Sequence, residues 1–304
     1  MTEGTTERDI EGLIFDVDTF AVHDGPGIRM SVYFKGCPLV CRWCHSPESQ
    51  SAKPQLILAR DRCVACGTCV QVCPQGVHHF DDGRHVVERD RCIVCGQCAQ
   101  ACVPGALAIK GHTITAGEII DQARRLKPFF DSSGGGITLT GGEVALQASF
   151  AEAILHGCQA MGIHTAIETC GASRWDRLEK LVRHTDLVLY DLKLIDDDAH
   201  RCQTGSSNRR ILDNAARLVD RNVQARVPLI PHITDTEENL RGIFAFMGRV
   251  GLSSVALLPY NTSAGAKYEW LDRPYELEGE QQTDEQLETF LVMAREEGLD
   301  AVVD

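Results

Sequence analysis

The sequence predicts an α/β fold, a partial (β/α)6 barrel interrupted once by a small cysteine-rich module. Two observations lead to this prediction. Short apolar segments alternate with longer amphipathic ones, which is typical of a parallel sheet covered by helices. Eleven of the 14 cysteines crowd between positions 37 and 102. We therefore expect residues 1–54 and 111–304 to form the barrel and residues 55–110 to form the inserted module.

The expected elements follow one another in βα order. The first strand covers residues 31–34, and five more are expected at 136–140, 164–168, 187–191, 224–228 and 255–259. Amphipathic helical patterns lie near 116–127, 147–161, 174–184, 208–221, 236–248 and 283–298. Together they give six βα units. Folds of this class bind ligands at the carboxyl ends of their strands.

A C-x3-C-x2-C run of Cys37, Cys41 and Cys44 follows the first strand. Three thiolates can hold three irons of a four-iron cluster and leave the fourth iron open, as an open position marks a catalytic zinc. The alternative is a zinc knot with His45 as the fourth ligand. We disfavour it because adjacent Cys44 and His45 would be strained as two ligands of one tetrahedral ion.

The inserted module contains the pattern C-x2-C-x2-C-x3-C twice, and the second copy begins 29 residues after the first. This is the bacterial ferredoxin spacing, in which the fourth cysteine of each run ligates the other cluster. One expected [4Fe-4S] site is Cys63, Cys66, Cys69 and Cys102. The other is Cys92, Cys95, Cys98 and Cys73. Because both ligand sets are complete, this ferredoxin-like module should transfer electrons, and its clusters should stabilise a chain too short for a large core.

Composition narrows the class of protein. The formal net charge of −13 argues against a nucleic-acid partner. The first residues carry no apolar signal core, and no run approaches the roughly 18 apolar residues of a membrane span. Cysteines committed to metal motifs indicate a reducing compartment, so we expect a cytoplasmic protein from an anaerobic organism.

Polar residues close several of the expected strands. The Gly-Gly turn at 141–142 would let a ligand approach the backbone, and Glu143 could accept a hydrogen bond from an ammonium group. Asp191 and Lys193 point the same way on a strand, although they could also form a surface ion pair of little energetic weight. Arg226 lies within an apolar strand and needs an anionic partner.

With these residues the chain resembles the radical S-adenosylmethionine (SAM) enzymes, and among them the glycyl-radical-enzyme activating enzymes similar to the pyruvate formate-lyase activating enzyme. The matching segments are 24–29, 37–44 with Trp43, 134–143, 168–169, 191–193, Arg226 and 257–260. The two-cluster insert resembles the subgroup that activates glycyl radical decarboxylases, dehydratases, lyases and fumarate-adding enzymes.

The resemblance implies an oxidoreductase mechanism. SAM binds the open iron through its amino and carboxylate groups, and one electron cleaves it to methionine and a 5′-deoxyadenosyl radical. That radical takes hydrogen from a backbone glycine of a partner glycyl radical enzyme. The implied catalytic residues are Cys37, Cys41, Cys44 and Asp24, the last near the substrate glycine loop. The implied SAM contacts are Trp43, Gly141, Gly142, Glu143, Lys193, Arg226 and Asn261.

The resemblance also implies cofactors and partners: three [4Fe-4S] clusters, SAM, and a monovalent cation at Glu168, Thr169 and Asp191. A flavodoxin or a ferredoxin would donate electrons. Three positions depart from the family pattern, and one of them is Val144, where many radical SAM proteins have proline after the Gly-Gly-Glu. Asn261 stands where a histidine often contacts SAM, and Glu168 stands where an aspartate can occur.

Two functions of other classes fit parts of the sequence. An electron-transfer protein would explain the inserted module, but a pure carrier does not need an open cluster. A radical SAM enzyme acting on a small molecule or another protein would often carry its extra clusters at the C-terminus. Residues 264–304 contain no cysteine, which favours the activating enzyme.

Overall fold

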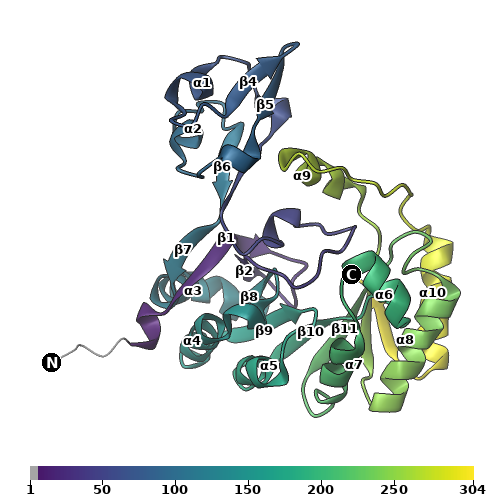
Figure 1. Cartoon of the computed structure of the whole chain (residues 1–304). Coiled ribbons are helices and arrows are strands. Elements are labelled where there is room, and N and C mark those ends of the chain that lie inside the picture. Colours follow the sequence, from purple (N-terminus) through teal and green to yellow (C-terminus); the bar gives the residue numbers. More distant parts are fainter. Residues whose placement is uncertain (1–5) are drawn as a thin grey trace.

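A computed structural model describes residues 6–304. Figure 1 shows a crescent-shaped α/β body and a small lobe beside it. The body is built on a nine-stranded sheet with the order β13-β12-β11-β10-β9-β8-β2-β1-β7. Seven neighbouring strands are parallel: β2 (Arg29–Phe34), β8 (Gly136–Gly141), β9 (His164–Thr169), β10 (Leu187–Asp191), β11 (Val223–Pro228), β12 (Ser254–Leu258) and β13 (Asp300–Val303). The predicted α/β fold with a parallel sheet is thus confirmed.

Helices cover the outer, convex face of this sheet (Figure 1). They are α3 (Ala116–Ser133), α4 (Ala148–Gln159), α5 (Trp175–Val182), α7 (Arg209–Ala216), α8 (Glu237–Val250) and α10 (Asp284–Glu296). Alternate strand residues point to opposite faces, so Ile137 and Leu139 of β8 join the main apolar core. Their neighbours Thr138 and Thr140 are buried on the inner face. The inner face is therefore polar although it is buried, which is unusual for a sheet that serves only as a scaffold.

Several elements lie outside the six predicted βα units. The long strand β1 (Glu11–Ala21) and β7 (His112–Thr115) extend one edge of the sheet in antiparallel fashion, and β13 extends the other edge. The short helices α6 (Asp197–Thr204) and α9 (Gly265–Trp270) lie in loops. β1 escaped prediction because bulges interrupt its alternation of buried and exposed residues.

Helix α3 runs six residues beyond its predicted end at 127. A capping box between Thr115 and Glu118 begins it, and Gly134 ends it in the left-handed region with φ of 70°. Pro128 lies inside the helix. Proline usually marks a helix boundary, which explains the early end in the prediction.

The lobe of residues 55–110 has internal two-fold symmetry. Strand β3 (Gln55–Leu58) pairs with β6 (Leu107–Lys110), and β4 (His78–Asp81) pairs with β5 (Arg84–Val87). A shift of 29 residues carries β3 onto β5, β4 onto β6 and the start of α1 (Thr68–Val72) onto that of α2 (Gln97–Gln100). Positive φ angles repeat as well, at Ala65 and Val94 with 52° and 54°. The duplicated sequence thus folds as a duplicated structure.

Contacts near α9 join the lobe to the body, and Figure 1 shows α9 reaching toward the lobe. Arg60 and Arg89 begin the 3-10 turns η3 (Arg60–Arg62) and η4 (Arg89–Arg91). Both arginines bind the carboxylate of Asp272, and Arg89 also donates to the carbonyl oxygen of Trp270 at 2.8 Å. Within residues 6–304, no helix has the length and apolar character needed to cross a membrane.

Candidate active site

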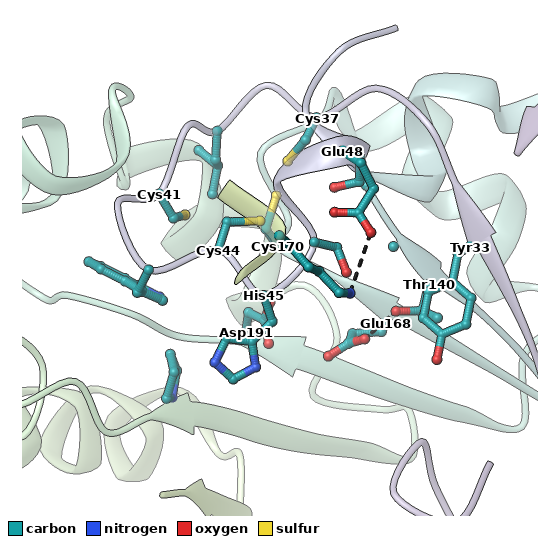
Figure 2. A pocket seen from close by; sticks show the side chains of 18 of the residues that line it. Tyr33, Cys37, Cys41, Cys44, His45, Glu48, Thr140, Glu168, Cys170 and Asp191 are labelled. Atoms are coloured by element: carbon teal, nitrogen blue, oxygen red, sulfur yellow. Dashed lines mark hydrogen bonds and ion pairs between the residues drawn. The ribbon is translucent and has the colours of Figure 1, made fainter. Parts of the chain in front are cut away.

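A cleft of about 820 Å³ opens on the inner face, at the carboxyl ends of the parallel strands. Its wall includes Thr140 and Gly141 from β8, Glu168 from β9, Asp191 from β10 and Arg226 from β11. The loop after β2 forms another wall and carries the three cysteines, as Figure 2 shows. The cleft therefore lies at the position where folds of this class bind ligands.

Cys37, Cys41 and Cys44 line this cleft from a single loop. Backbone bonds fix the loop: Gly36 N donates to Ser49 O at 2.7 Å, and Val40 N donates to Thr204 O at 2.8 Å. Burial raises the pKa of Cys41 to about 12 and that of Cys44 to about 11. Both are thiols in the bare loop, and a bound metal would displace their protons.

The cleft cysteines do not form the close group that a zinc knot requires. Tetrahedral Zn–S bonds of about 2.3 Å bring sulfur atoms within ~4 Å of one another. Within the described chain, the group of three potential ligands whose atoms all lie within 4.8 Å is Cys69, His78 and His85, in the lobe. This favours a cluster, which is larger than a single ion, over zinc in the cleft.

The Gly-Gly turn ties β8 to the cysteine loop. Gly142 N donates to Phe34 O, and Glu143 N donates to Gly36 O, both at 2.8 Å. Gly141 has φ of 97°, and a Cβ at Gly142 would lie 2.2 Å from the carbonyl oxygen of Gly36. Neither position accepts a side chain without strain. Both glycines line the cleft, so backbone is presented there.

The carboxylate of Glu143 is fully buried and does not line the cleft. It accepts from the Thr169 hydroxyl at 2.8 Å, from Cys170 N at 3.0 Å and from Ala145 N at 3.1 Å. Burial raises its pKa. The side chain expected to accept from an ammonium group is thus already bonded to protein, and it holds the ends of β8 and β9 together.

Cys170 was missed by the sequence analysis, although it directly follows Glu168 and Thr169 at the end of β9. Its thiol donates to Glu143 Oε2 at 3.0 Å. The neighbouring Cys37, together with burial, holds the pKa of Cys170 well above its usual range. Cys170 is therefore a protonated neighbour of the cysteine loop and leaves the set of three thiols unchanged.

Lys193 and Asp191 form an ion pair at 2.7 Å inside the cleft, with side chains only 10% and 17% exposed. The surface ion pair weighed as an alternative is therefore wrong. Burial alone would lower the pKa of Lys193, but Asp191 and Cys41 together raise it above its usual value. Lys193 thus carries its positive charge into the cleft.

Arg226 has the anionic partner that its place in an apolar strand requires. It pairs with Glu168 and Asp304, each at 3.1 Å, and donates to His23 O at 3.1 Å. Its Nε is buried without a partner. The guanidinium therefore lines the cleft with one donor still unsatisfied.

The remaining predicted residues differ in position. Trp43 and Asp24 line the cleft, and Asp24 accepts from Ser31 and, at 3.4 Å, from the hydroxyl of Tyr33. Asn261 is exposed outside the cleft lining, where its side chain accepts from Ser263 N and caps η6 (Thr262–Ala264).

The three residues expected to hold a cation all line the cleft, and each is bonded to protein. Glu168 accepts from Thr140 besides pairing with Arg226, and the Thr169 hydroxyl donates to Glu143. Asp191 is held by Lys193. One further cleft acid, Glu48, is buried and lies 3.4 Å from Lys267. Sequence reasoning missed Glu48 because it lies in the 3-10 turn η2 (Pro47–Ser49), outside any recognisable pattern.

The lobe brings its eight motif cysteines together in two groups. Cys63, Cys66, Cys69 and Cys102 line one small cavity. Cys73, Cys92, Cys95 and Cys98 line another. These are the two groups expected from the spacing.

The sequence and structure were compared with known proteins. A family model described as the radical SAM superfamily matches residues 31–243. The choline trimethylamine-lyase activating enzyme of Oleidesulfovibrio alaskensis is 41% identical over 278 residues, covering 88% of this chain and 90% of the relative. The trans-4-hydroxy-L-proline dehydratase activating enzyme of Clostridioides difficile is 40% identical over 279 residues, covering 90% and 92%.

A solved structure of a radical SAM methyltransferase from Sphaerobacter thermophilus matches with a TM-score of 0.53 at 17% identity. The match covers 91% of this chain and 66% of that chain, and it shows likeness of fold alone. The sequence matches are more specific, because they extend over nearly whole chains at about 40% identity. They show that this chain belongs to the radical SAM superfamily, in the group of the glycyl-radical-enzyme activating enzymes.

Proposed function

We propose that this enzyme cleaves SAM reductively at the cysteine loop and uses the 5′-deoxyadenosyl radical to take hydrogen from a backbone glycine of a partner protein. The observation that carries the proposal is the meeting of Cys37, Cys41 and Cys44 with the Gly141–Gly142 backbone in one cleft. Three thiols from one loop, with the neighbouring Cys170 kept protonated, fit a four-iron cluster with an open position. When bound, that cluster supplies an electron and a coordination site for SAM.

The chain's own groups orient SAM. The glycine backbone accepts from its ammonium group, and Glu143 acts behind the glycines by holding the ends of β8 and β9. Lys193 and Arg226 bring positive charge toward the SAM carboxylate, and Trp43 adds apolar surface beside the loop. A cleft of about 820 Å³ is within the usual range for a ligand of this size. Asn261 would reach SAM only after leaving its capping position.

A monovalent cation completes the proposed site at Glu168, Thr169 and Asp191. These oxygen-bearing side chains line the cleft from the ends of two adjacent strands. Hard cations prefer such oxygen ligands. Comparing SAM cleavage in potassium and tetramethylammonium buffers tests this part of the proposal.

The lobe supplies electrons in this proposal. Its two cysteine groups would each hold a [4Fe-4S] cluster, which makes residues 55–110 a ferredoxin-like module inserted between residues 1–54 and 111–304 of the barrel. A flavodoxin or a ferredoxin in the cytoplasm would reduce the module. The gathering of the eight cysteines around two cavities supports the assignment.

The partner is a glycyl radical enzyme. The relatives are named as activating enzymes of a lyase and of a dehydratase, and partners of that kind are proposed here. In this proposal Asp24 meets the incoming glycine loop, and its position in the cleft lining beside Tyr33 supports that role.

The test is anaerobic incubation of the reconstituted enzyme with SAM, a reductant and the glycyl radical enzyme encoded nearby. Electron paramagnetic resonance should show a carbon-centred doublet on the partner, split by one α-hydrogen, with 5′-deoxyadenosine formed alongside. Cys41→Ala is the control and should give neither product. Consumption of SAM without that doublet on any neighbouring glycyl radical enzyme would favour a small-molecule substrate.

A further inference from the structure

Two buried histidines in the lobe have no role in the proposed chemistry. His78 and His85 are 2% and 4% exposed. His85 Nδ1 lies 3.6 Å from Cys63 Sγ, and its Nε2 lies 3.5 Å from Cys69 Sγ and 3.0 Å from His78 Nδ1. Phe80 stacks on the His85 ring at 5.0 Å between centroids. The ring is therefore fixed with both nitrogens facing cysteine sulfurs of one cavity.

The internal symmetry makes this arrangement one-sided. The 29-residue shift carries Leu56 onto His85 and His78 onto Leu107. Leu56 pairs with Ile109 across β3 and β6, as His85 pairs with Phe80 across β5 and β4. Leu56 and Ile109 line the cavity of Cys73, Cys92, Cys95 and Cys98. His78 also lines this second cavity, but among the described residues the imidazole that contacts cysteine sulfurs is that of His85, at the first site. The second site thus has leucine where the first has its sulfur-bonded imidazole.

The contact with His78 selects the tautomer of His85. A neutral imidazole carries one N–H. With that N–H on Nδ1, His85 donates to Cys63, and its Nε2 accepts from His78 Nδ1 at 3.0 Å. In this form a cysteine sulfur accepts a hydrogen bond, and His78 orients the ring. Hydrogen bonds to the sulfurs of an iron–sulfur cluster help to set its potential, because they stabilise the reduced, more negative state.

We propose that His85, positioned by His78, raises the reduction potential of the cluster site at Cys63, Cys66, Cys69 and Cys102 above that of its symmetry mate. This rests on the proposed two-cluster module. One electron enters and later leaves, with no bond made or broken. The two clusters are then inequivalent, and an electron given to the module is held first at the site whose sulfurs His85 contacts.

The two cluster sites also differ in their position relative to the body. The β3–β6 sheet adjoins the body, where Lys110 pairs with Asp16 at 2.6 Å and Gln55 accepts from Lys35 at 3.2 Å. Leu56 and Ile109, the next residues along those strands, line the cavity of the second site. The histidines belong to β4 and β5, which Figure 1 shows at the end of the lobe away from the body. The first site takes Phe80 and His85 from that end, whereas the second takes Leu56 and Ile109 from the strands beside the body, so the first is the outer site and the second the inner one.

The test is an anaerobic redox titration of the full chain, followed by electron paramagnetic resonance. A Cys41→Ala background removes the signal of the proposed open cluster. His85→Leu should lower the reduced-to-oxidised ratio of the outer cluster at least tenfold at a given potential, a shift of about 59 mV for one electron. Leu56→His should have the opposite effect on the other cluster and raise the reduction potential of the inner site.

Two controls separate tuning from packing. His85→Gln keeps an N–H donor and should retain most of the wild-type potential. His79→Leu changes the neighbouring histidine of β4, whose side chain is 49% exposed, and should leave both potentials unchanged.

The outcomes distinguish the inference from the assignment beneath it. About eight irons in the Cys41→Ala background support two clusters, and markedly fewer would overturn the two-cluster module itself. With eight irons present, unchanged potentials in both His85→Leu and Leu56→His would overturn the tuning role. Stoichiometric zinc that is lost in His85→Leu would also overturn it, because Cys69, His78 and His85 would then be a separate metal site. If His85→Leu fails to hold its cluster, the Leu56→His result decides.

Discussion

Arg60 and Arg89 occupy equivalent positions in the two repeats of the lobe and bind opposite oxygens of one carboxylate, that of Asp272. Equivalent residues of the two repeats thus contact the same side chain of the body. Asp272 itself has φ of 54°, a conformation that aspartate tolerates better than most residues.

Asp272→Ala should loosen the lobe without unfolding it. The three side chains are 23–30% exposed, so each ion pair contributes no more than about 1 kcal/mol. Amide hydrogen exchange in residues 55–110 should accelerate while the body is unaffected. Asp272→Asn keeps a residue type that tolerates this φ but removes the charge. Its amide exchange rates in residues 55–110 should fall between those of the wild type and those of Asp272→Ala. Unchanged exchange in the alanine variant would mean that other contacts hold the lobe.

Iron content should separate the three proposed clusters. The reconstituted enzyme should bind about twelve irons, three cubanes of four. Cys41→Ala should lose about four irons and all SAM cleavage, because its thiol belongs to the cleft. Cys66→Ala should lose a lobe cluster, slow reduction by the physiological donor and destabilise residues 55–110. A reproducible four-iron preparation with zinc in the lobe would contradict this assignment.

Lys193→Ala and Arg226→Ala should each weaken SAM binding by roughly 1.5–3 kcal/mol, the worth of a charged hydrogen bond. Arg226→Ala also leaves the partly buried Glu168 without its cation, so the free energy of unfolding should fall as well. Isothermal titration of SAM measures the first effect, and thermal unfolding measures the second. Lys127→Ala removes a cation paired with Asp131 on helix α3 and serves as the control. Equal SAM affinity in all three variants would remove both residues from the SAM site.

Glu143→Ala should act through the backbone. It leaves the Thr169 hydroxyl and two backbone N–H groups without an acceptor, at about 1–3 kcal/mol for each unsatisfied group. Stability should fall, and SAM affinity should fall with it as the glycine turn loses its support. Cys170→Ala removes only the thiol that donates to the same carboxylate, so it should lower stability and SAM affinity less. Full stability in Glu143→Ala would mean that the ends of β8 and β9 need no such tie.

Asp24→Ala should impair activation of the partner more than it impairs uncoupled SAM cleavage. Asp24 lines the cleft with Tyr33 and accepts from the buried Ser31, whereas the cysteine loop lies on another wall. The ratio of partner radical to 5′-deoxyadenosine measures the difference. Asp18→Ala is a matched control, since Asp18 is a cleft acid on β1. A proportional loss of both products in Asp24→Ala would assign Asp24 to SAM cleavage instead.

The sequence predicts the parallel sheet because each of its strands is an apolar run followed by polar residues, as in β8 and β10. It predicts which cysteines lie together, because the spacing within each motif is local information. It could not assign the carboxylate of Glu143, since Thr169 and Cys170 reach it only after two strands pair. Asp272 escaped notice for the same reason: its partners are 212 and 183 residues away. Contacts made by the tertiary fold leave no periodicity in the chain.

Among the described residues, the sheet runs from β13 to β7 without pairing those two strands. A closed ring of strands limits its entrance to the width between loops, and only a small molecule or a free chain end can pass. An interrupted ring has a lateral gap, through which a continuous peptide can enter and leave without being threaded. For the proposed function this would set a size rule for substrates: a loop still anchored at both ends in a large folded protein would need no threading.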